Sequence, residues 1–211
     1  MSTQSTEQIT VYSDYVCPFC YLGRESLSRY QADRDEELEI NWQPFDLRHG
    51  KRNPDGTIDH SVDDGKDDDY YEQAKASVRN LQEKYDVDMA LDLATEVDSF
   101  NAQIASYYVA EHYPYETWFD FDEAIFAALW QAGRDIGDAD VLADLADEVG
   151  VDPEEVRSAL DDETLREAID AEWTTAQQQG ITGVPTFAYD GYAARGAVPP
   201  EHLQRLVEDV E

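Results

Sequence analysis

The side chains best suited to chemistry in this sequence are two cysteines, Cys17 and Cys20, the only ones among its 211 residues. They stand directly after an apolar-rich run at residues 9–12, and a helical pattern follows them at residues 21–30. A C-x-x-C pair between a predicted strand and a predicted helix is typical of a thiol redox motif in an intracellular protein. The spacing therefore favours thiol–disulfide chemistry at this pair.

The predicted start of the helix gives the two cysteines different roles. Cys17 is expected at the helix N-terminus, where unpaired N–H groups and the helix dipole stabilise a negative charge. Its thiolate is therefore expected to be the attacking sulfur. Cys20, one turn further on, is placed to close a disulfide or to resolve a mixed disulfide. Pro18 suits the first helical turn, where its missing N–H costs nothing.

The cysteine pair has two alternative interpretations. A structural zinc site needs about four ligands, and the remaining candidates are scattered along the chain at His49, His60, His112 and His202. A structural disulfide over this spacing closes too short a loop to constrain the unfolded chain much. We therefore predict no metal site, and no cofactor besides the redox-active dithiol.

A second chemical landmark stands at residues 180–187, which have the sequence G-I-T-G-V-P-T-F. A proline at the start of a predicted strand is unusual. Such a proline can hold a cis peptide bond, which is normally a specific requirement of the structure. Val184 and Pro185 are therefore candidate site-shaping residues.

Together the two landmarks resemble the DsbA family of thioredoxin-fold oxidoreductases and, within it, a FrnE-like branch of cytoplasmic proteins. The resemblance covers about residues 8–210, and its matching segments are 13–23, 42–47, 101, 133–136 and 180–187. It implies an α/β, thioredoxin-like fold with a large all-helical insertion. It also implies that Val184, ahead of a cis-Pro185, presents its backbone to the redox cysteine, with Pro18 and Phe19 shaping the site.

The activity implied is thiol–disulfide exchange, which reduces, oxidises or isomerises the disulfide of a protein or of a small thiol. The Pro18-Phe19 dipeptide between the cysteines contains no histidine, so one stabiliser of a strongly oxidising thiolate is missing. This favours a reductase or isomerase over a strong oxidase. We interpret Tyr12, Tyr15 and Phe19 as core residues in preference to an apolar rim for an extended substrate.

Two other functions stay open from the sequence. Kappa-class glutathione transferases and 2-hydroxychromene-2-carboxylate isomerases are similar in the proline loop, but typically carry serine at the position of Cys17 and lack the second cysteine. The two thiols here favour dithiol chemistry over a glutathione-dependent reaction, although residues 195–198 (R-G-A-V) depart from many relatives. The remaining alternative is a redox-sensing or chaperone-like binding protein that uses its helices as a surface.

The composition is strongly acidic, with 48 Asp and Glu against 15 Lys and Arg and a formal net charge of −33. Lysine is scarce and occurs only as Lys51, Lys66, Lys75 and Lys84. Such a surface repels nucleic acid and anionic membranes, which bind clustered Lys and Arg. Because the acidic residues are spread over helical stretches and do not form a tail, they indicate the cytoplasmic protein of a halophile.

Neither a secretory segment nor a membrane span is predicted. Residues 1–8 are polar and lack a positive start, and no stretch approaches the roughly 20 apolar residues that a spanning helix needs. We therefore expect a cytoplasmic protein.

The order of patterns predicts an α/β unit in two parts, residues 1–67 and 181–211, with a helical insertion at 68–180. The first part is a parallel strand–helix–strand unit at 8–14, 18–31 and 38–43. The last part is a short hairpin that turns at Asp190-Gly191, followed by a helix from Pro199. Between them, residues 70–179 are helical in pattern throughout, with helices predicted at 70–85, 100–113, 117–131, 140–149, from 153, and at 163–179.

An acidic loop is predicted at residues 48–69. We interpret it as a solvated connection in preference to a flap over the substrate groove. Its aspartates lack the spacing of a calcium-binding loop, so no calcium site is predicted.

The charge leads to a first prediction, that the fold loosens in dilute buffer. Self-repulsion of a net charge of −33 destabilises the compact state, and salt screens it because the Debye length falls from about 10 Å at 0.1 M to about 3 Å at 1 M. The melting temperature measured by calorimetry is expected to rise with KCl concentration. An equal melting temperature in molar salt and in salt-free buffer would contradict this.

Overall fold

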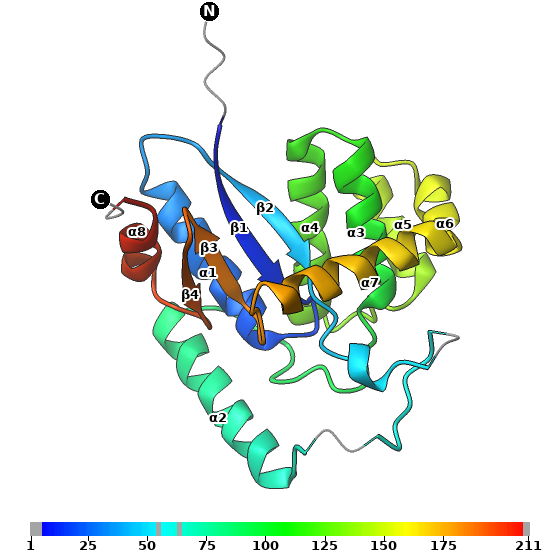
Figure 1. Ribbon diagram of the computed structural model, residues 1–211, viewed down its shortest axis with the longest axis horizontal. Coiled ribbons are helices and arrows are strands. Elements are labelled where there is room, and N and C mark those ends of the chain that lie inside the picture. Colours follow the sequence, from blue (N-terminus) through cyan, green and yellow to red (C-terminus); the bar gives the residue numbers. More distant parts are fainter. Residues whose placement is uncertain (1–5, 54–55, 63–64, 209–211) are drawn as a thin grey trace, which may run out of the picture.

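A mixed β-sheet joins the two ends of the chain (Figure 1). The computed structural model describes residues 6–53, 56–62 and 65–208. Within them the sheet has the order β2-β1-β3-β4, with β1 at Glu7–Ser13, β2 at Leu38–Pro44, β3 at Thr186–Tyr189 and β4 at Tyr192–Arg195. β1 is parallel to β2 and antiparallel to β3, and β4 is antiparallel to β3. The predicted α/β class is thus confirmed.

β1 is a central strand, and buried side chains on both of its faces pack in apolar clusters. Ile9 and Val11 are buried in the main core. Tyr12 points to the opposite face, where it packs in a second cluster with Phe45 and Ala176. Successive side chains of a strand alternate between its faces, so this strand can carry helices on both sides.

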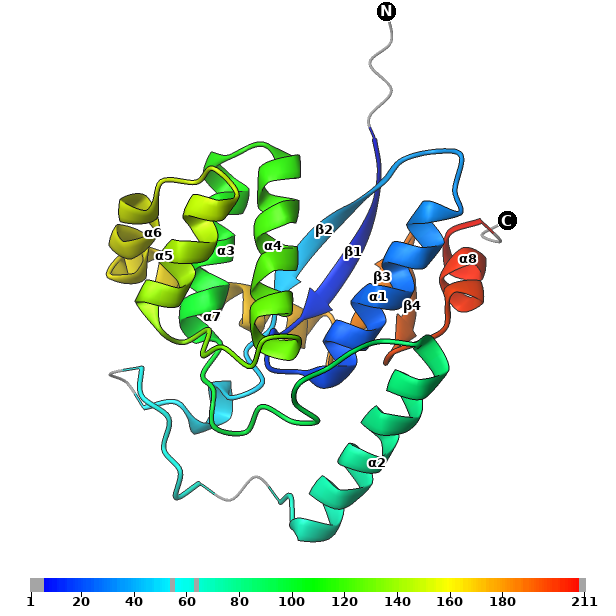
Figure 2. The ribbon, with the colours of Figure 1, turned by 180° about the vertical axis from the view of Figure 1, so that it is seen from behind.

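Helices cover the two faces of the sheet, and the two views in Figures 1 and 2 show them on opposite sides. On one face lie α1 (Pro18–Ala32) and α8 (Pro200–Glu208), whose buried residues include Leu27 and Leu203. On the other lies α7 (Glu163–Gln178), which contributes Ala176 to the cluster around Tyr12. The centre of the sheet is therefore covered on both faces, whereas the edge strand β4 is largely exposed.

A group of helices continues the fold beyond the edge strand β2. It consists of α3 (Phe100–His112), α4 (Tyr115–Trp130), α5 (Ala139–Glu148) and α6 (Pro153–Leu160), gathered on one side in Figure 2. Three helix starts in this region are capped by aspartates, because Asp138, Asp152 and Asp162 each accept a hydrogen bond from the N–H two residues further on. Some of the acidic residues therefore stabilise the starts of helices.

Helix α2 (Asp68–Tyr85) stands away from that group and packs on α1. Its buried Val78 and Tyr85 form a cluster with Leu22 of α1. Asp86 adopts a left-handed conformation with φ of 48° and ends the helix. Residues 86–99 then form no helix, so the prediction of a helical pattern from 70 to 179 is wrong there. Outside this segment the predicted helices lie within two residues of the observed ones.

Arg52 anchors the base of the acidic loop. Its guanidinium donates to Asp46 (Nε to Oδ2, 2.8 Å) and to Asp98 (Nη1 to Oδ2, 2.9 Å), and to the Gly56 carbonyl at 2.8 Å. The loop also contains a short 3-10 helix at His49–Lys51. Residues 54–55 and 63–64 of the predicted loop lie outside the described residues.

A buried polar network joins β1 and α1 to the helical group. The Tyr15 hydroxyl lies 2.8 Å from both Asp122 Oδ1 and Ser106 Oγ. The Arg24 guanidinium pairs with Asp122 (Nη2 to Oδ2, 3.2 Å), and both side chains are almost fully buried. Burial raises the pKa of Asp122 to about 6, while Arg24 acts to lower it.

No helix in the described part of the chain is long and apolar enough to cross a bilayer.

The buried polar network gives a stability prediction. Arg24→Met keeps an unbranched apolar stem but removes the guanidinium and leaves Asp122 buried without its cation, which typically costs about 3–5 kcal/mol. The double variant Arg24→Met/Asp122→Asn removes the orphaned charge and keeps an acceptor for Tyr15, so it is expected to recover a large part of the loss. Chemical denaturation in molar KCl measures both. A single variant as stable as the wild type would contradict the role assigned to the pair.

Candidate functional site

Cys17 lies at the start of α1, where the sequence predicts it. It is the N-cap residue, with extended backbone angles (φ −88°, ψ 113°), and Pro18 occupies the first helical turn. The Cys17 carbonyl accepts the first hydrogen bonds of the helix, from the N–H of Cys20 at 3.0 Å and of Tyr21 at 3.3 Å. The sulfur is therefore held at the positive end of a helix dipole.

The proline loop from the far end of the chain meets this helix start. The Cys17 Sγ donates to the Val184 carbonyl oxygen at 3.7 Å, and the peptide bond between Val184 and Pro185 is cis. The structure therefore brings together the two landmarks that the sequence singles out.

Gly23 is what lets α1 approach that loop. A Cβ atom at this position would lie 3.1 Å from Pro185 Cγ and 3.1 Å from Phe187 Cζ, closer than ordinary contacts. A side chain at this position would require Pro185 or Phe187 to shift by a few tenths of an ångström. Gly23 belongs to the motif at residues 13–23, but its close contact with the proline loop is visible only in three dimensions.

The two thiols lie in different environments. Both cysteines are unpaired and buried, with 5% of Cys17 and 2% of Cys20 exposed, but Cys17 lines an open groove and Cys20 does not. Burial raises the pKa of Cys20 well above its ordinary value, and its hydrogen bond with Cys17 acts in the same direction. Cys20 is thus held as a neutral thiol at neutral pH.

A buried carboxyl group, Asp14, lies in the same region. Its side chain accepts hydrogen bonds from the N–H of Val16 at 3.2 Å, from the N–H of Leu47 at 2.9 Å and from the Ser99 hydroxyl. Burial raises its pKa to about 6, and the neighbouring Asp46 adds to the effect. The charge of Asp14 in turn raises the pKa of Cys20, whereas a hydrogen bond from its backbone lowers it. Sequence reasoning missed this residue, since the partners of Asp14 come from three separate segments.

We call the open space in front of the sulfur the Cys17 groove. It has a volume of about 410 Å³, and its lining residues fall within 16–19, 47–74, 93–95 and 182–184. Of the predicted site residues, Cys17, Pro18, Phe19 and Val184 line it, while Cys20 and Pro185 lie buried behind.

The structure tests two interpretations from the sequence, that of the three aromatic residues and that of the acidic loop. Tyr12 and Tyr15 are buried, at 8% and 1% exposure, as the core interpretation predicts. Phe19 is half-buried: it packs against two of the core clusters and also lines the groove. The acidic loop is more than a solvated connection, since Arg48, Lys51 and other residues of it form one wall.

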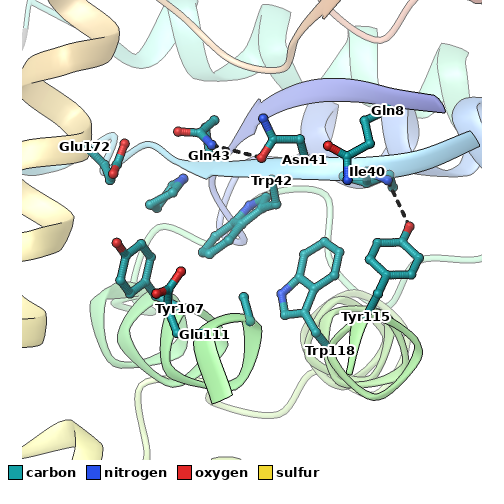
Figure 3. Close-up of a pocket in the computed structure, with 12 residues that line it drawn as sticks. Gln8, Ile40, Asn41, Trp42, Gln43, Tyr107, Glu111, Tyr115, Trp118 and Glu172 are labelled. Atoms are coloured by element: carbon teal, nitrogen blue, oxygen red, sulfur yellow. Dashed lines mark hydrogen bonds between the residues drawn. The ribbon is translucent and has the colours of Figure 1, made fainter. Parts of the chain in front are cut away.

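A second hollow lies between β2 and the helices α3 and α4 (Figure 3). It has a volume of about 300 Å³ and contains no cysteine. Trp42 and Trp118 line its middle, and Glu111 and Glu172 lie toward Tyr107 at one end. Both indole N–H groups are used internally, by Ser13 and Ser106. In the described residues no three His, Cys, Asp or Glu side chains gather where they could hold a metal ion.

Comparisons with known proteins agree with this geometry. A family model described as a DSBA-like thioredoxin domain matches residues 8–208. Protein YwbO of Bacillus subtilis (strain 168), described as uncharacterized, is 29% identical over 205 residues, which is 97% of each chain.

Solved structures confirm the thioredoxin-like fold. A probable DsbA oxidoreductase from Streptomyces coelicolor has a TM-score of 0.77 at 22% identity and covers 96% of this chain and 88% of its own. A 2-hydroxychromene-2-carboxylate isomerase has a TM-score of 0.72 at 19% identity and covers 90% of this chain and 89% of its own. At these identities the similarity concerns the fold.

The electrostatics of the site predict the effect of Asp14→Asn. Because the Asp14 charge raises the pKa of Cys20, removing it is expected to lower that pKa. The thiolate absorbance of a Cys17→Ser background, followed against pH, reports Cys20 alone. Asp122→Asn is the matched control, because the pKa of Asp122 is also raised to about 6 but its charge is not among those acting on Cys20. Equal shifts in the two variants would contradict the assignment.

Proposed function

Because the chain belongs to the DsbA-like thioredoxin domain family, we propose that it is a thiol–disulfide oxidoreductase that works through the Cys17–Cys20 dithiol. The observation that carries the proposal is the difference between the two thiols. Cys17 opens onto a groove from the start of a helix. Cys20 is buried behind it with a raised pKa. One sulfur is thus placed to meet a substrate and the other to react second.

In the first step the Cys17 thiolate attacks a substrate disulfide. A new S–S bond forms between Cys17 and one substrate sulfur, and the substrate S–S bond breaks. The leaving thiolate takes up a proton from water and departs as a thiol. Cys17 stands at the N-terminus of α1 and lines the groove from which the substrate would arrive.

In the second step Cys20 attacks Cys17 Sγ. The mixed disulfide breaks, the Cys17–Cys20 disulfide forms, and the second half of the substrate leaves as a thiol. The substrate disulfide thereby gains the two electrons that the protein dithiol loses. Cys20 must first lose its proton, and Asp14 is the group proposed to receive it. The pKa of Asp14 is raised only to about 6, so its carboxylate is available at neutral pH.

The proline loop supports substrate binding in this proposal. The Val184 carbonyl that meets Cys17 Sγ lies at the edge of the groove. The backbone of Gly183 and Val184 is therefore available to align an extended disulfide substrate through main-chain hydrogen bonds.

We propose reduction or isomerisation as the direction, in a cytoplasmic setting and with no cofactor besides the dithiol. The Pro18-Phe19 dipeptide supplies no histidine that would favour a strong oxidant. In a reducing compartment such a dithiol is kept in its reduced form, so it acts in catalysis and does not form a structural disulfide.

A glutathione-dependent isomerase is the second candidate, because an isomerase of this kind shares the fold. The presence of both Cys17 and Cys20 at the site argues against it, since an isomerase of this type does not need the second thiol. The FrnE-like branch remains part of the proposal on the sequence resemblance alone.

Insulin reduction by dithiothreitol, measured in molar KCl, tests the proposal. Cys17→Ser is expected to reduce the rate to that of dithiothreitol alone. Cys20→Ser is expected to lose turnover and to accumulate a mixed disulfide at Cys17, detectable by mass spectrometry. Full turnover by Cys17→Ser would refute a thiol mechanism at this site. Full turnover by Cys20→Ser would favour the glutathione-type candidate.

A further inference from the structure

The second hollow combines two carboxylates with aromatic rings (Figure 3). Glu111 of α3 and Glu172 of α7 lie at the end where Tyr107 stands. Trp42 of β2 and Trp118 of α4 line the middle. Four separate elements thus bring acidic and aromatic side chains to one cavity, which the proposed dithiol chemistry does not use.

The two carboxylates have no cation beside them in the described lining, which contains no lysine, arginine or histidine. None of the ion pairs between described residues includes Glu111 or Glu172. His112, the next residue after Glu111, stacks on Tyr108 and lies outside the lining. Glu111 also stands in the last turn of α3, where the negative end of the helix dipole disfavours a carboxylate. This end of the hollow therefore attracts a positive charge that its own lining does not supply.

The rings beside the carboxylates present mainly carbon to the hollow. The indole N–H groups of Trp42 and Trp118 are engaged inside the fold, at 2.9 Å and 3.0 Å from their serine acceptors. The centres of these two rings are 6.3 Å apart, and the Tyr115 ring lies 5.6 Å from that of Trp118. The π-face of such rings attracts a cation, most strongly when the cation is poorly hydrated. Aromatic rings next to carboxylates thus suit a positive charge that carries carbon substituents.

The size of the hollow and the state of its strand favour a small molecule over a peptide. Its volume of about 300 Å³ is at the lower end of the range of about 300–1,000 Å³ that is typical of small-ligand pockets. A peptide strand would have to pair with the free edge of β2. There the Ile40 N–H already donates to the Tyr115 hydroxyl at 2.9 Å, so this edge is partly closed.

An inorganic cation fits the hollow poorly. Calcium and magnesium take about six or more oxygen ligands in a compact shell. In the described residues no three His, Cys, Asp or Glu side chains gather where they could hold a metal ion. Rings that fill the middle of the hollow supply no further ligands.

We propose that the second hollow binds a small organic ammonium ion. Glu111 and Glu172 hold its positive nitrogen, and its carbon substituents lie against the rings of Tyr107 and Trp42. No described residue lines both this hollow and the Cys17 groove. The inference therefore goes beyond the proposed function and does not depend on it.

Choline and 3,3-dimethylbutan-1-ol provide a matched pair of probes, because they share one shape and differ by the exchange of the charged nitrogen for carbon. Binding of each is followed by ligand-observed NMR titration in molar KCl. The salt screens the general attraction of a chain with a net charge of −33 for any cation, so the affinity reports local contacts. Choline is expected to bind saturably and about tenfold or more tightly than the neutral alcohol.

The glutamates allow a matched comparison of variants. Glu111→Gln/Glu172→Gln removes both charges of the hollow. Glu148→Gln/Glu167→Gln removes two charges from exposed positions of α5 and α7 outside it. The first pair of changes is expected to weaken choline binding by about tenfold, as for two partly exposed charge contacts, and to leave the neutral alcohol within about twofold. The second pair is expected to change neither affinity by more than that.

The ring contribution is tested at Tyr107, which is half-buried. Tyr107→Leu removes the ring and is expected to weaken choline binding by about fivefold. Tyr107→Phe keeps the ring and loses only the hydroxyl, so it is expected to bind choline within about twofold of the wild type. Thermal melting followed by circular dichroism shows that each variant is folded at the temperature of the titration.

The outcomes separate this inference from the proposed function. The absence of saturable choline binding, equal affinities for choline and the neutral alcohol, or equal effects of the two double variants would overturn the inference. Cys17→Ser is expected to bind choline as the wild type does while it loses insulin reduction. If folded Cys17→Ser loses choline binding, the ammonium ion lies in the Cys17 groove and the inference is wrong. The insulin assay judges the proposed function in each case.

Discussion

The structure depends on the contact between the first turn of α1 and the proline loop. The loop comes from the far end of the chain, yet its Val184 carbonyl meets the sulfur of Cys17. Gly23 has no side chain to crowd Pro185 and Phe187 where the helix approaches them. Strand pairing of β1 with both β2 and β3 fixes the two segments at the same end of the sheet. The sheet, α1 and the proline loop together hold Cys17 against the Val184 carbonyl.

Behind that contact the protein keeps ionisable groups in its interior. Asp14 and Asp122 are both fully buried, and burial raises the pKa of each to about 6. They differ in their partners. Asp122 has the Arg24 guanidinium beside it, whereas Asp14 has N–H and hydroxyl donors and a second carboxylate, Asp46, nearby. Asp122 therefore suits a structural role between the sheet and the helices, and Asp14 suits an exchange of protons near Cys20.

The sequence predicts the features of this molecule that depend on neighbouring residues. The strand before Cys17, the helix that starts at Pro18 and the capped start at Asp152 all follow from local signals. The features that depend on distant contacts were out of reach. The close approach at Gly23 and the partners of Asp14 exist only once separate segments meet. Residues 86–99 were misjudged because their acidic and apolar alternation has no helix-breaking proline or glycine.

The location of the arginines changes what the solvent meets. The side chains of Arg24, Arg34 and Arg52 are only 6–8% exposed, and each is paired with carboxylates inside the fold. Their positive charge is therefore largely withdrawn from the solvent. The surface that the solvent meets is thus more acidic than the ratio of 15 basic to 48 acidic residues alone indicates.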